Sequence, residues 1–82
     1  MFNTKKFRRL IEESGLSPLD IDRGMFAEKE ASGVHLTHNT VRQYMGLRGN
    51  KKVEPNSVKL HALIKYIERR LKRKIDFESF FD

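Results

Sequence analysis

Apolar and polar residues alternate at helical spacing near the start of the chain. The i, i+3, i+4 stripe there predicts a helix that begins at Asn3 or Thr4 and ends at Ser14. Gly15 fits the left-handed position that commonly follows a helix, and Leu16 then returns to the core. The apolar stripe of this helix consists of Phe7, Leu10 and Ile11.

A second helix has a clear start. Ser17 can cap it, Pro18 suits the first helical position, and Asp20 places an acid at the third position. Gly24 weakens the helical pattern, so we expect the end to fall somewhere within residues 25–32. The apolar contacts expected from this helix are Leu19, Ile21, Met25 and Phe26.

Residues 36–46 predict a short helix with one apolar and one polar face. Thr37 can cap its start, and Gly46 stops it. The apolar face consists of Leu36, Val41 and Tyr44, and the polar face of His38, Asn39, Arg42 and Gln43. Asn and Gln can pair with adenine, Arg with guanine, and His can donate to guanine or to a phosphate. An ordinary surface helix more often carries Glu and Lys, so this face favours DNA reading, with an ordinary polar face on a helical domain as the alternative.

A basic loop follows this short helix. Gly49 and Asn50 mark a turn. Arg48, Asn50, Lys51 and Lys52 have the chemistry for phosphate contacts, although a solvated basic loop is the alternative.

A long helix is predicted from Pro55 or Asn56 to about Arg73. Its final third carries six cations, more than the helix dipole alone requires. Asp76 can then cap a last short helix with an inward-facing aromatic cluster, or residues 75–82 form a strand that pairs with a second subunit. The apolar stripe of the long helix is Val58, Leu60, Leu63, Ile64, Ile67 and Leu71, and the aromatic cluster is Phe77, Phe80 and Phe81.

The charge is distributed unevenly along the 82 residues. Residues 37–74 contain eleven Lys and Arg against two acids, a balance of +9, whereas residues 10–36 carry −4. The whole chain is +6. Such polarity steers a polyanion toward one face, with a merely solvated basic face as the alternative.

Several function classes lack support in the sequence. The length predicts a single domain over residues 1–82, and the absence of cysteine excludes disulfides and thiol catalysis. His35, His38 and His61 lack the cysteines or nearby acids that a zinc site needs, so no metal is expected. There is no nucleophile motif or phosphate loop, which argues against an enzyme and a cofactor. No apolar run approaches the ~18 residues of a membrane span, and we expect a cytoplasmic, nucleoid-associated protein of a bacterium or phage.

The order of these parts resembles the lambda-repressor-like helix-turn-helix family of the Cro/repressor type. The resemblance rests on residues 17–21, residues 36–44, Pro55 before the long helix, and residues 75–81. It implies an all-α domain of four to five helices that acts as a homodimer and regulates transcription, as a repressor, from a site with two half-sites. One departure is an insertion, Ala27 to His35, between the second and third helices.

Together, the residues and the resemblance predict sequence-specific binding of double-stranded DNA. The alternative is a small helical adaptor or inhibitor that binds a protein, and RNA binding is a third option without a visible stacking platform. The residues expected to contact DNA are Thr37, His38, Asn39, Thr40, Arg42, Gln43, Arg48, Asn50, Lys51 and Lys52.

Overall fold

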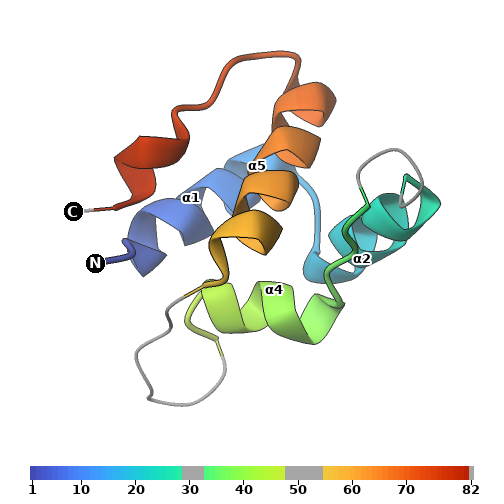
Figure 1. Ribbon diagram of the computed structural model, residues 1–82, viewed down its shortest axis with the longest axis horizontal. Helices are drawn as coiled ribbons and strands as arrows, with labels where there is room; N and C mark the ends of the chain where they lie inside the picture. Colours follow the sequence, from blue (N-terminus) through green and yellow to red (C-terminus); the bar gives the residue numbers. More distant parts are fainter. Residues whose placement is uncertain (29–32, 48–54, 82) are drawn as a thin grey trace.

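The computed structural model describes residues 1–28, 33–47 and 55–81. Over these residues the protein is all-helical, with four α-helices, one short 3-10 helix and no β-strand, which confirms the predicted all-α class. The α-helices are α1 (Thr4–Ser14), α2 (Pro18–Ala27), α4 (His38–Tyr44) and α5 (Ser57–Leu71), and the 3-10 helix is η1 (Phe77–Phe80). In Figure 1, α4 lies at one end of the molecule, while α2 and the C-terminal segment flank α1 and α5 on opposite sides.

Each helix begins at a side-chain cap, and the caps at Ser17, Thr37 and Asp76 confirm those that the sequence predicted. The Asn3 side chain accepts from the Lys6 backbone N–H at 3.0 Å. Ser17 and Asp20 form a reciprocal capping box, and the backbone and side-chain hydrogen bonds from Ser17 lower the pKa of the Asp20 carboxyl. Thr37 and Asn56 cap α4 and α5 in the same way.

The helix ends also follow the expected chemistry. Gly15 after α1 and Gly46 after α4 adopt φ values of 72° and 75°, which glycine reaches without strain. Helix α2 ends at Ala27, inside the predicted range. Helix α5 ends at Leu71, two residues earlier than expected, because Lys72 takes the left-handed conformation at φ 56°.

One apolar core joins all the helices. Most of the expected core residues are buried in it, although Leu16 and Leu71 are only partly buried at its edge. The buried core residues are Phe2, Phe7, Leu10, Ile11, Ile21, Met25, Leu36, Val41, Tyr44, Met45, Leu60, Leu63, Ile64, Tyr66, Ile67 and Phe80.

Three residues that were expected on the apolar faces of their helices are exposed instead. Leu19 and Phe26 on α2 are exposed, because the buried residues of this short helix are Ile21 and Met25, one turn apart. Leu19 lies two positions before Ile21, about 200° around the helix, and Phe26 lies one position after Met25, about 100° around it. Both side chains are therefore on other faces than the buried pair. Val58 on α5 is exposed for the same reason, since the buried residue nearest to it is Leu60.

The two ends of the chain meet. The Asn3 N–H donates to the Phe80 carbonyl at 2.6 Å, and Phe2 and Phe81 form an isolated antiparallel bridge. The Phe7 ring contacts Phe80 edge-on, with 6.4 Å between centroids. The closing segment is therefore a single 3-10 turn followed by one bridge to the N-terminus of the same chain.

Candidate nucleic-acid interface

Helix α4 is held in place by its inner face. Val41 and Tyr44 are buried, and Leu36 just before the helix is buried as well. The Tyr44 ring packs edge-on against Phe7, with 6.3 Å between centroids, and α4 packs against α2. The predicted apolar face of this short helix is therefore confirmed, and it fixes which residues face outward.

The outer face of α4 carries exposed polar side chains without an acid. Asn39, Arg42 and Gln43 are all exposed. Their side chains make no hydrogen bond or ion pair with the described residues, so they remain available to an external partner. No Asp or Glu lies in residues 33–47. This face therefore presents one cation, Arg42, and two hydrogen-bonding amides on the exposed side of the helix.

Asp22 of α2 binds the start of α4. Its Oδ2 accepts from the His38 backbone N–H at 2.9 Å and lies 2.9 Å from His38 Nδ1. Its Oδ1 contacts His35 Nε2 at 2.5 Å. One carboxylate of α2 thus contacts both the segment before α4 and the first residue of α4.

These contacts change the electrostatics of Asp22. The side-chain hydrogen bond from His38, followed by those from the His35 ring and the His38 backbone, lowers the pKa of the Asp22 carboxyl to about 2. The carboxylate is therefore ionised at neutral pH, but two imidazoles cover it, and only 18% of its side chain is exposed. An acid beside the polar face of α4 is shielded from an approaching polyanion.

Three predicted DNA-contacting residues have partners within the protein. Thr37 caps α4 through its hydroxyl, which accepts from the Thr40 N–H at 3.3 Å and lies 3.1 Å from the Thr40 hydroxyl. His38 uses Nδ1 toward Asp22, so Nε2 is its ring nitrogen left for an outside partner. Four more of the predicted residues lie outside the described part of the chain: Arg48, Asn50, Lys51 and Lys52.

The predicted insertion is described in part. Helix α2 ends at Ala27 with Glu28 as its cap, residues 29–32 lie outside the described residues, and Gly33 resumes at φ 71°. Val34 and Leu36 then return to the core, as expected. His35 makes two contacts here, one to Asp22 and one to the Phe26 ring at 5.4 Å between centroids.

The cations of α5 do not form one basic face with α4. Arg69 pairs with Glu28 of α2 and the following Arg73 pairs with Glu13 of α1, each at 2.9 Å. Figure 1 shows that α5 begins near α4 and ends at the far side of the molecule. Two cations of the basic stretch are therefore paired with acids of the acidic stretch, a pairing that charge sums along the chain do not reveal.

Sequence reasoning missed the role of Asp22. Its partners lie 13 and 16 residues away, a separation with no local spacing rule.

Among the described residues no group of three or more His, Cys, Asp or Glu side chains is arranged to hold a metal ion. No helix in this part of the chain has the length and apolar character needed to cross a membrane.

Comparison with known proteins assigns no family to this chain. No family model matches it, and no curated protein and no solved structure is significantly similar to it. The likeness to helix-turn-helix repressors consequently rests on the residues and motifs of the chain itself.

Proposed function

We propose that this protein binds double-stranded DNA and reads the major groove with α4, as a small transcriptional regulator. The observation that carries the proposal is the outer face of α4. Asn39, Arg42 and Gln43 are exposed, lack partners among the described residues, and stand on a helix anchored by its buried face. These side chains are the types that pair with adenine and guanine edges.

Two further features support a polyanionic partner. The nearest acid of α2, Asp22, is covered by His35 and His38 rather than facing outward. His38 has one ring nitrogen left beside the same face, suited to a phosphate or a guanine acceptor. In the sequence, residues 48–54 follow α4 and include three of the basic side chains expected to bind phosphate.

A homodimer on two half-sites is part of this proposal. One helix of seven residues reaches few base pairs, and two copies about a dyad place two such helices about 34 Å apart. The aromatic tail is largely used within one chain, because Phe80 is buried and Phe77 and Phe81 pack against the core. Dimerisation on DNA therefore needs a surface other than Phe80, and sedimentation with a two-half-site duplex measures the stoichiometry.

The test combines selection with a matched pair of variants. Duplexes enriched from a random library by the protein define its preferred site, and fluorescence anisotropy then compares that site with random DNA. We expect Arg42→Ala to lose about 1–3 kcal/mol on the selected site and much less on random DNA. Arg70→Ala removes the same charge from an exposed position on α5 and should leave the preference unchanged.

Two results would overturn the proposal. One is the absence of any enriched sequence together with no salt-dependent binding to duplex DNA, which would favour a protein-binding adaptor. The other is an equal loss of preference in both variants, which would show that α4 is not the reading element.

A further inference from the structure

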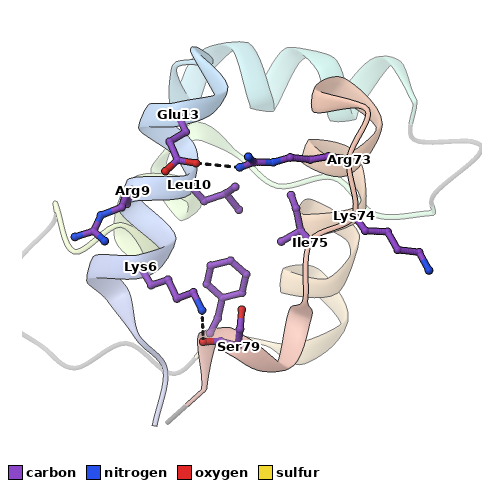
Figure 2. Close-up of a pocket in the computed structure, with 9 residues that line it drawn as sticks. Lys6, Arg9, Leu10, Glu13, Arg73, Lys74, Ile75 and Ser79 are labelled. Carbon is purple, nitrogen blue, oxygen red and sulfur yellow. Dashed lines mark hydrogen bonds and ion pairs between the residues drawn. The ribbon is translucent and has the colours of Figure 1, made fainter.

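A cavity of about 300 Å³ lies between α1 and the chain that follows α5. Its walls come from residues 6–13 on one side and residues 73–80 on the other, and no residue of α4 lines it. Figure 2 shows the space framed by these two segments. The cavity is therefore separate from the proposed DNA-binding face.

Three apolar side chains form part of the cavity wall, beside polar and charged ones. In Figure 2, Leu10 of α1 and Ile75 extend into it from opposite walls. Phe80 also lines the cavity and is almost fully buried, as Leu10 is. Aliphatic and aromatic walls of this kind bind the apolar body of a ligand by removing it from water.

One hydrogen bond and one ion pair connect the two walls of the cavity. Lys6 Nζ donates to the Ser79 carbonyl at 3.1 Å and lies 5.4 Å from the centroid of the Phe80 ring. At the other end, Arg73 pairs with Glu13 at 2.9 Å. These two contacts connect α1 to the C-terminal segment across the cavity (Figure 2).

The lining carries an excess of positive charge. It has four cations and one acid, Glu13, which is committed to Arg73. The Lys6 ammonium has a carbonyl and a ring as neighbours but no carboxylate among the described residues. Arg9 and Lys74 stand at opposite rims, where Figure 2 shows both extending away from the centre. Lys6 is thus the lining cation that points toward the cavity without a carboxylate partner in the described part of the chain.

We propose that this cavity binds a small amphipathic anion, with a carboxylate head beside Lys6 and an apolar body against Leu10, Ile75 and Phe80. A neutral apolar compound leaves the Lys6 ammonium without a counter-charge, and a fully hydrated anion such as acetate leaves the apolar side chains of the wall uncovered. At roughly 30 Å³ for each water-sized group, 300 Å³ accommodates about ten non-hydrogen atoms. A carboxylate with a seven-carbon tail has that size.

Octanoate is the probe for a test on the full chain. Amide chemical shifts and calorimetry are recorded with octanoate, with 1-octanol, which lacks the charge, and with acetate, which lacks the tail. We expect octanoate to bind with a dissociation constant on the order of 1 mM and to shift the amides of residues 6–13 and 73–80. Octanol should bind at least about tenfold more weakly, and acetate should not shift these amides.

A matched pair of lysine variants tests the position of the head group. Lys6→Gln should weaken octanoate binding about fivefold, whereas Lys5→Gln removes the same charge from the next exposed position of α1, which does not line the cavity, and should have no effect. Both side chains are exposed, so both variants should keep the helical circular-dichroism spectrum.

Three results would overturn the proposal: no shift at 10-fold excess over the expected constant, equal binding of octanoate and octanol, or equal effects of the two lysine variants. The test does not depend on DNA binding, because none of its measurements contains nucleic acid.

Discussion

Replacing Asp22 by Asn tests whether one carboxylate positions α4. The variant keeps the size of the side chain and an oxygen for the His38 N–H, but it cannot accept from both imidazoles. A lowering of the pKa of Asp22 from 3.8 to about 2 corresponds to about 2 kcal/mol of stability. Because solvent reaches part of the side chain, we expect a loss of about 1–2 kcal/mol at pH 7.

The stability contributed by the Asp22 carboxylate should decrease as the pH falls. A carboxylate with a lowered pKa stabilises the folded chain fully above its ordinary pKa of 3.8, and this stabilisation disappears as the pH falls through about 2. The difference between the parent chain and Asp22→Asn should therefore be complete at pH 6 and reduced to about half at pH 3. Below about pH 2 the two chains should unfold alike.

Thermal unfolding followed by circular dichroism is the assay. In a chain of this length, 1–2 kcal/mol lowers the midpoint by roughly 5–10 °C. The control is Glu12→Gln, which removes the same charge from an exposed site on α1 and should change stability by less than about 0.5 kcal/mol. Equal midpoints for the two variants at pH 7, or a difference that does not shrink by pH 3, would refute the argument.

Two further predictions concern packing. In Gly24→Ala the new Cβ would lie 1.8 Å from the Tyr66 hydroxyl oxygen. Despite the higher helix propensity of Ala, we expect the free energy of unfolding in urea to fall by about 1–3 kcal/mol, and adding Tyr66→Phe should recover part of it. A more stable Gly24→Ala chain would contradict this. Phe80→Ala should lower the free energy of unfolding by about 3 kcal/mol because the ring is buried against Phe7. Phe77→Ala, at a partly buried position, should lower it by less than half as much. Equal losses in urea unfolding would show that the tail does not pack as described.

The parts of the fold that the sequence predicted are those with local causes. Caps such as Ser17 and stops such as Gly15 act within one turn, so their effect can be read from neighbouring residues. The inner and outer faces of α4 followed from helical spacing in the same way.

The missed features depend on contacts between distant residues. Gly24 reads as a weak point in a helix, yet in the fold it leaves room for Tyr66, which sequence analysis did not place in the core. Asp22 meets its histidines across 13 and 16 residues, and Arg73 meets Glu13 across 60. Hydrophobic periodicity carries no information on such pairs, so neither the Asp22 contacts nor the charge pairing of α5 could be predicted.

The meeting of Asn3 with Phe80 makes the backbone a nearly closed ring. The hydrogen bond between them is 2.6 Å long, and the flanking Phe2 and Phe81 are bridged. A short linker could therefore join the two ends covalently, and the chain could be opened elsewhere to give a circular permutant with the same core. The chain with joined ends, not reopened elsewhere, would have fewer unfolded conformations to lose. It should therefore fold to the same structure with greater stability than the linear chain.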